Sequence, residues 1–151
     1  MRIILSAILM LLFHTAPASA ENNFAVQQEK AEKHAQKIIE ACWSISEDLR
    51  SGSTADMREG SGKSIECLTN EIENLSKKMF TPEKQKEFSG HLKQHTESAY
   101  YLYYQLYNEH KNCHPCGTQY HVVYLGATAN VLEDLLKSMV QQAYEFDFIA
   151  D

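Results

Sequence analysis

Apolar residues recur along this chain at alternating spacings of three and four, which is the period of a helix packed on one side. The first such run extends from Phe24 to Leu49. Its apolar or small residues are Ala31, Ala35, Ile38, Cys42, Ile45 and Leu49. This pattern predicts a first helix with one stripe facing a core.

Glycine and serine interrupt the pattern at 51–54 and again at 60–62. Between these breaks, 54–59 predicts at most a short helical turn. A second helix is expected from about Lys63 to Met79. The residues on its inner stripe are Leu68, Ile72, Leu75 and Met79.

Thr81, Pro82 and Glu83 predict the start of a third helix, since threonine can cap, proline suits the first helical position and glutamate complements the helix dipole. This helix is expected to run from Pro82 to about Asn112. Its inner stripe comprises Phe88, Leu92, His95, Ala99, Leu102 and Leu106. We therefore expect His95 to be a core histidine.

The segment 111–118 contains Pro115 and Gly117, which mark a turn. A fourth helix is predicted from about Thr118 to Tyr144. The residues expected to face inward are Val123, Ala127, Val131, Leu135 and Met139. Because strand alternation is absent from the sequence, the fold class predicted is all-α: a small antiparallel bundle of about four helices.

The first 20 residues have the pattern of an export signal. Arg2 precedes an apolar run from Ile3 to Phe13, and the small residues Ala18-Ser19-Ala20 follow. Cleavage after Ala20 would leave 21–151 as one helical-bundle domain, located in the periplasm or secreted. The apolar run is shorter than the roughly 20 residues that span a bilayer, so stable membrane insertion is not expected.

Four cysteines follow this segment: Cys42, Cys67, Cys113 and Cys116. In an oxidising compartment an even number favours two disulfides. Cys42 and Cys67 are expected at matching heights of the first helical hairpin, which favours their pairing and leaves Cys113 with Cys116 across the later turn. Four cysteines allow three pairings, and a crossed pairing of the hairpins remains open.

The chain is acidic, with a formal net charge of −6, and loss of Arg2 with the signal leaves 13 basic and 20 acidic residues, or −7. This balance argues against nucleic acid and anionic membrane surfaces as partners and favours a cationic protein. The alternative is that the charge only keeps an exported protein soluble.

Five tyrosines occur within eight residues of the third helix and place aromatic surface on nearly every side of it. Some of these rings are expected to face a rim, a groove or a partner. The alternative is that the rings are buried while their hydroxyls stay in water. The candidates for partner binding are Tyr100, Tyr103, Tyr104 and Tyr107.

Ligands for a metal ion also occur around the third turn: His110, Cys113, His114, Cys116 and His121. Thiolate and imidazole suit zinc and copper, although this site would need reduced thiols. The Cys-His-Pro-Cys spacing also matches dithiol oxidants, whose motifs normally open a helix in an alternating strand-helix fold. His91 and His95 form a second, smaller metal pair.

Catalytic motifs are absent from the sequence, which has no glycine-rich phosphate loop and no nucleophile elbow. Glu133 and Asp134 are expected to form a solvated face. We therefore expect a protein that is not an enzyme and carries no cofactor.

Short motifs resemble the LprI-type lysozyme inhibitor family. They are Thr54-Ala-Asp-Met57, Glu66-Cys67-Leu68, a tyrosine-rich run from Leu92 to Cys113, and Gly117-Thr118 before a helix with Thr128 and Leu135. The chain departs from that pattern in the long Met57 to Cys67 spacing, in Tyr103-Tyr104 where an aromatic-arginine pair is usual, and in the early Cys116. The resemblance implies a small, exported, disulfide-bonded helical protein that inhibits lysozyme.

Overall fold

The structure is a computed structural model that describes residues 18–108 and 119–149. Within these ranges it contains four long helices and one short helix. In chain order they are α2 (Ala18–Ser44), α3 (Glu47–Arg50), α4 (Thr54–Met79), α5 (Pro82–Asn108) and α6 (Gln119–Glu145). The described residues contain no strand, so the all-α prediction is confirmed.

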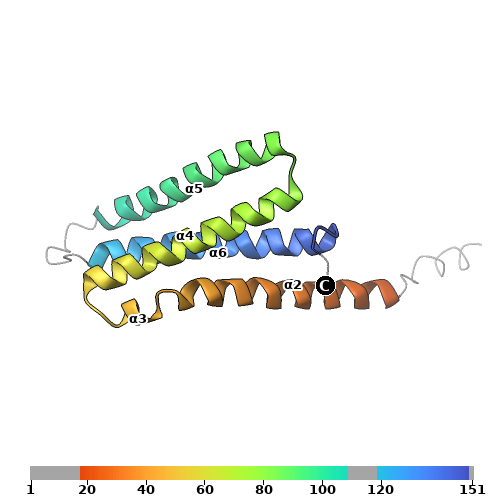
Figure 1. Cartoon of the computed structure of the whole chain (residues 1–151), viewed down its shortest axis with the longest axis horizontal. Coiled ribbons are helices and arrows are strands. Elements are labelled where there is room, and N and C mark those ends of the chain that lie inside the picture. Colours follow the sequence, from red (N-terminus) through yellow and green to blue (C-terminus); the bar gives the residue numbers. More distant parts are fainter. Residues whose placement is uncertain (1–17, 109–118, 150–151) are drawn as a thin grey trace, which may run out of the picture.

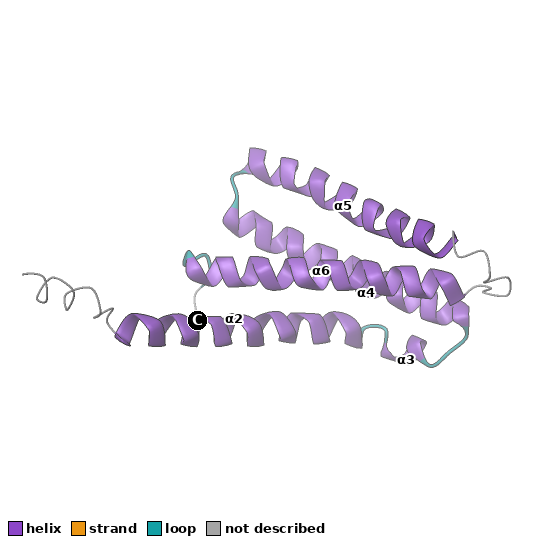
Figure 2. Ribbon diagram, turned by 180° about the vertical axis from the view of Figure 1, so that it is seen from behind, coloured by secondary structure: helices purple, strands orange, loops and turns teal. Residues whose placement is uncertain are grey.

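The long helices lie side by side and antiparallel to their chain neighbours (Figure 1). Helices α4 and α6 form the middle of the bundle, with α2 on one side and α5 on the other (Figure 2). Helix α6 packs against α2, α4 and α5. The core therefore lies mainly between α2, α4 and α6, and α5 is an outer helix.

Apolar side chains from these three helices form the centre of the core. Its fully buried members include Leu68 and Ile72 of α4 and Leu132, Leu136 and Val140 of α6. The inner stripe predicted for α6 was one residue out of register. Val123 is exposed and Met139 is buried, whereas Ala127, Val131 and Leu135 are half-buried. Because α6 has neighbours on several sides, two adjacent stripes are covered, and periodicity alone cannot choose between them.

Two other stripe predictions were wrong at their ends. Ile45 is 57% exposed because α2 ends at Ser44 and the chain turns there. On α5, Leu92 and Ala99 are buried as predicted, but Leu102 is 61% exposed and His95 is also exposed. Because α5 is an outer helix that packs mainly on α6, fewer of its apolar residues are buried than the sequence pattern predicts.

Helix α4 begins at Thr54, nine residues before the predicted start, and continues through 60–62. A capping box explains the early start. The Ser53 hydroxyl accepts from the Asp56 N–H at 3.3 Å, and the Ser53 N–H donates to Asp56 Oδ2 at 2.7 Å. The bonds from the Ser53 hydroxyl and backbone hold the pKa of Asp56 below its usual range. A depressed carboxyl pKa means that the cap stabilises the fold near neutral pH and weakens upon acidification.

Gly60 lets the turn after α2 approach α4 closely. A Cβ at this position would lie 3.0 Å from the Cβ of Leu49 and 3.1 Å from that of Ser46. Ser46 is itself fully buried, and its hydroxyl lies 2.8 Å from the Ser64 hydroxyl, one turn further along α4. Gly60 therefore allows the turn after α2 to pack closely against α4, whereas the sequence pattern indicated that this glycine breaks a helix.

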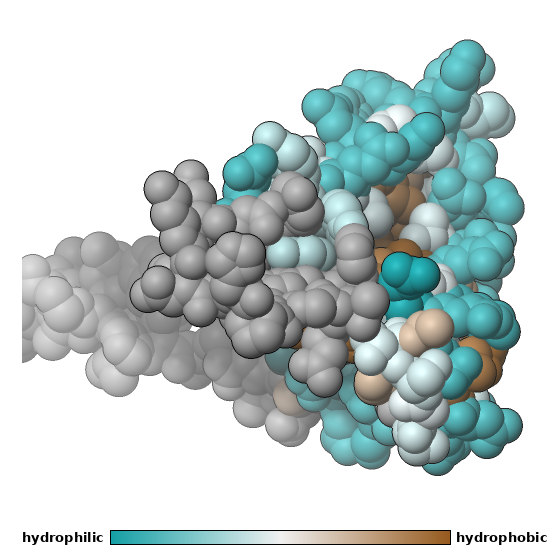
Figure 3. Space-filling model, turned by 90° about the vertical axis from the view of Figure 1, so that its left-hand side faces the viewer, coloured by the Kyte–Doolittle hydropathy of each residue, from teal (hydrophilic) through white to brown (hydrophobic). Residues whose placement is uncertain are grey.

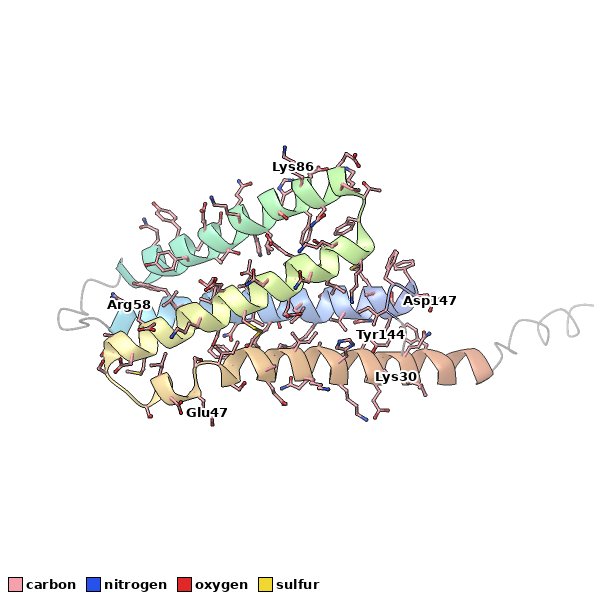
Figure 4. All side chains as sticks on the ribbon, viewed as in Figure 1. Lys30, Glu47, Arg58, Lys86, Tyr144 and Asp147 are labelled. Atoms are coloured by element: carbon pink, nitrogen blue, oxygen red, sulfur yellow. A yellow bond between two sulfur atoms is a disulfide. The ribbon has the colours of Figure 1, made fainter. Side chains whose placement is uncertain are left out.

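A disulfide joins α2 to α4. Cys42 and Cys67 are bonded, with their Cα atoms 5.4 Å apart, and Figure 4 shows the bond between the two helices. This confirms the pairing predicted from their matching heights. Cys113 and Cys116 lie outside the described residues, as does most of the predicted signal peptide, 1–20. In the described part of the chain, no helix is both long enough and apolar enough to cross a bilayer.

We predict that Gly60→Ala lowers the free energy of unfolding by about 1 kcal/mol, because overpacking outweighs the helix propensity that alanine gains. The matched control is Gly62→Ala, two residues further on, where a Cβ would meet nothing within 4 Å. That variant should gain up to about 1 kcal/mol. Urea unfolding of both variants measures the difference, and a gain at both positions would refute the close approach.

We predict that replacing both Cys42 and Cys67 by alanine lowers the unfolding free energy by about 3 kcal/mol, because the disulfide closes a 25-residue separation. Replacing Cys113 and Cys116 together should cost less, because their loop is short. Thermal unfolding compares the two double variants. Equal losses, or peptide mapping that links Cys42 to Cys113, would contradict the predicted pairing.

Candidate functional site

A groove opens at the end of the bundle where α2, α3, α4 and α6 meet. We call it the Trp43 groove, and its volume is about 560 Å³. Its lining residues are Gln36, Ile39, Glu40, Trp43, Ser44, Glu47, Met57, Ser61 and Val122. None of these residues was predicted as a site from the sequence, because they come from four separate helices that only the fold brings together.

Trp43 is the only tryptophan, and a hydrogen bond to α6 fixes its position. Its indole Nε1 donates to Glu133 Oε1 at 2.5 Å, and both side chains are half-buried. A hydrogen bond to an ionised carboxylate is stronger than one between two neutral groups. The solvated face predicted for Glu133 and Asp134 is confirmed for Asp134, which is exposed and whose Oδ1 lies 3.4 Å from Lys137 Nζ, whereas Glu133 is half-buried and hydrogen-bonded.

Apolar and acidic groups meet in the Trp43 groove. Ile39, Met57 and Val122 are buried or half-buried and provide apolar surface beside the indole. Glu40 and Glu47 are exposed carboxylates, and no lysine or arginine is among the described residues that line the groove. The Glu40 side chain accepts a hydrogen bond from Gln36 at 3.0 Å. The groove is therefore suited to an apolar group that ends in a positive charge.

Hydrophobic and hydrophilic side chains both reach the surface at this end of the molecule. Figure 3 shows hydrophobic side chains interspersed among hydrophilic ones on the face that looks along the helices. Glu47 on α3 and Arg58 on α4 both lie at this end (Figure 4), and Arg58 does not line the groove. The negative potential in the groove thus comes from Glu40 and Glu47 without a basic lining residue to cancel it.

Of the four candidate tyrosines, the structure describes the side chain of Tyr100, and it also describes that of Tyr101, which was not a candidate. Tyr100 is half-buried, and its ring meets that of Tyr124 of α6 edge-on with centroids 5.7 Å apart. Tyr101 is 59% exposed and accepts a hydrogen bond from Gln105. Tyr103, Tyr104 and Tyr107 belong to α5, but their side chains lie outside what the structure describes. The role of the tyrosines in partner binding stays a prediction.

A second groove of about 510 Å³ runs along α5, and we call it the His91 groove. Its lining residues are Phe88, His91, Leu92, Gln94, His95, Ser98 and Leu135. Both histidines predicted as a pair thus face the same groove. His91 and His95 are exposed, and only Leu135 comes from α6.

The other metal and redox candidates cannot be placed. His110, Cys113, His114 and Cys116 lie outside the described residues, and so does the side chain of His121. Among the described residues, no group of three or more histidine, cysteine, aspartate or glutamate side chains is arranged to hold a metal ion. The possible zinc, copper or dithiol site on the Cys113 turn stays a prediction.

Comparisons with known protein families, curated proteins and solved structures found no match. The resemblance to LprI-type inhibitors therefore stays an expectation from the sequence motifs.

We predict that Glu133→Ala lowers the unfolding free energy by about 1.5–3 kcal/mol, because it removes a hydrogen bond to a charged group and leaves the half-buried indole N–H without this acceptor. The matched control is Asp134→Ala, which removes the neighbouring exposed carboxylate and should change stability by no more than about 0.5 kcal/mol. Urea unfolding measures both. Similar losses for the two variants would show that the Trp43 bond does not stabilise the fold.

Proposed function

We propose that this protein is an exported binding protein of the cell envelope that captures a cationic protein through the Trp43 groove. The observation that carries the proposal is the combination of a fixed indole, apolar neighbours and two exposed carboxylates in one groove. Lysozyme is the first candidate partner, on the basis of the LprI-type resemblance and the net charge of −7 expected for the mature chain.

A lysine or arginine side chain matches the groove chemically. Its aliphatic stem would lie against Met57 and the face of the Trp43 ring, and its charged head would reach Glu40 or Glu47. A cation over an indole contributes about 0.5–2 kcal/mol, depending on how far water is excluded. The hydrogen bond from Trp43 to Glu133 holds the indole in place before the partner arrives, which reduces the entropy lost on binding.

The acidic surface would act mainly on the association rate. A net charge of −7 attracts a cationic partner over a distance comparable to the Debye length, so binding should weaken with added salt. Tyr101 and Leu102 add exposed apolar area in the C-terminal half of α5. The C-terminal end of α5 lies at the same end of the bundle as α3 (Figure 1). Tyr101 and Leu102 are the natural outer contacts of a partner that reaches across from the groove.

We predict that Glu40→Gln combined with Glu47→Gln weakens lysozyme binding by about tenfold or more, because it removes two charges that would meet the basic side chain. The control is Glu32→Gln combined with Glu66→Gln, two exposed residues outside the groove that change the net charge equally. Isothermal titration at about 0.01 M and 1 M salt, where the Debye lengths are about 30 and 3 Å, measures affinity and salt dependence.

The single tryptophan provides a local readout. In ¹⁵N-labelled protein, the indole N–H of Trp43 gives one resonance, and we expect unlabelled lysozyme to shift it. Binding that leaves this resonance unchanged, or equal weakening by the groove and control variants, would refute the groove as the site. Absence of any binding at low salt would refute lysozyme as the partner.

A further inference from the structure

The side of α5 that borders the groove next to α6 carries two exposed imidazoles one helical turn apart. His91 and His95 are four residues apart and both line the His91 groove. Side chains at this spacing lie on the same face of a helix, with Cβ atoms about 5–6 Å apart. Two imidazoles on such a face can approach one ion together, since metal–nitrogen bonds are about 2.0–2.1 Å long.

No described hydrogen bond joins the His91 or His95 ring to another residue, and the described interaction of His91 is an electrostatic one with Glu87. His34 provides the contrast, because its Nδ1 lies 3.0 Å from the hydroxyl of Tyr144, which extends from α6 toward α2 (Figure 4). His34 is therefore a structural histidine, whereas His91 and His95 have ring nitrogens available to a ligand.

We propose that His91 and His95 form a chelating site for a divalent transition-metal ion, with Cu²⁺ bound most tightly and Zn²⁺ more weakly. Imidazole suits both ions, and the order follows the general affinity of nitrogen ligands for first-row metals. The site shares no residue with the Trp43 groove or with the Cys113 to Cys116 motif.

Polar neighbours complete the surroundings of the ion. Gln94 and Ser98 line the same groove and can hold the water molecules that fill the remaining coordination positions. Glu87 lies one turn before His91. Glu87 Oε2 accepts a hydrogen bond from Lys84 Nζ at 2.8 Å, and this bond and the charge of Lys84 hold the pKa of Glu87 below its usual range, with a smaller electrostatic contribution from His91. The negative charge of Glu87 would offset part of the charge of a bound ion.

A metal ion bound at this position would stabilise α5. Helix α5 packs on α6 from one side, and the buried apolar side chains described on it are Leu92 and Ala99. An ion that joins two successive turns binds only when those turns are helical, so it stabilises the folded form of α5. With two protein ligands, the site should bind more weakly than a closed four-ligand structural site.

The test is titration of the mature chain (21–151) with Cu²⁺, Zn²⁺ and Mg²⁺ at about pH 7.5, where an imidazole of ordinary pKa is mostly neutral. We expect Cu²⁺ to bind more tightly than Zn²⁺, and Mg²⁺ not to bind because it requires oxygen ligands. His91→Asn and His95→Asn should each weaken Cu²⁺ binding at least about tenfold, because the second imidazole binds intramolecularly.

A matched variant tests whether Cu²⁺ binding depends on the spacing of the two histidines or only on their number. Lys93→His combined with His95→Asn keeps two histidines on α5 but places them two residues apart, where they do not face each other. It should bind Cu²⁺ no better than His95→Asn alone. Because Cu²⁺ is paramagnetic, substoichiometric amounts should selectively broaden the backbone amide resonances of 88–98 in the native chain and not in this variant. Equal broadening in both chains, or affinity unchanged by His91→Asn, would overturn the proposal.

Discussion

The geometry of the molecule depends on how α2 is held against α4. The Cys42–Cys67 disulfide fixes the two helices near the point where α2 ends. Four residues beyond Cys42, the buried Ser46 hydroxyl meets that of Ser64, and Gly60 leaves room for Ser46 and Leu49. A covalent bond, a hydrogen bond and a close approach therefore act together over a short stretch. They determine where the chain turns after α2, and the capping box of Ser53 and Asp56 determines where α4 begins.

The Trp43 groove is a consequence of that arrangement. Trp43 follows Cys42 directly, so the disulfide that fixes the end of α2 also places the indole near Glu133 of α6. Met57 and Ser61 come from the first turns of α4, which exist as a helix because of the Ser53 and Asp56 capping box. A groove built on disulfide-linked helices loses little conformational entropy on binding, which favours recognition by a preformed surface.

The sequence predicted where the helices occur better than it predicted which of their residues are buried. The all-α class, the start of α5 at Pro82 and the Cys42–Cys67 pair followed from periodicity, helix-start residues and cysteine positions. The break expected at 60–62 was wrong because a glycine required for close packing looks the same in sequence as one that ends a helix. The groove could not be predicted, because its residues come from segments up to 86 positions apart, Gln36 and Val122. The prediction that His95 is buried was wrong because α5 contacts the core along only part of its predicted inner stripe.

The two proposed sites lie on parts of the bundle with different anchoring. Helix α2 is joined to α4 by a disulfide and to α6 by two hydrogen bonds, one between His34 and Tyr144 and one that Trp43 donates to Glu133. Helix α5 has no described disulfide, and its described contacts with α6 include the edge-on pair of Tyr100 and Tyr124. Local opening costs least where few apolar side chains are buried, so α5 is the helix whose folded state a bound ion would change most. Since Tyr101 and Leu102 continue the same helix toward the groove end, an ion at His91 and His95 would also order the outer part of the surface proposed to meet the partner.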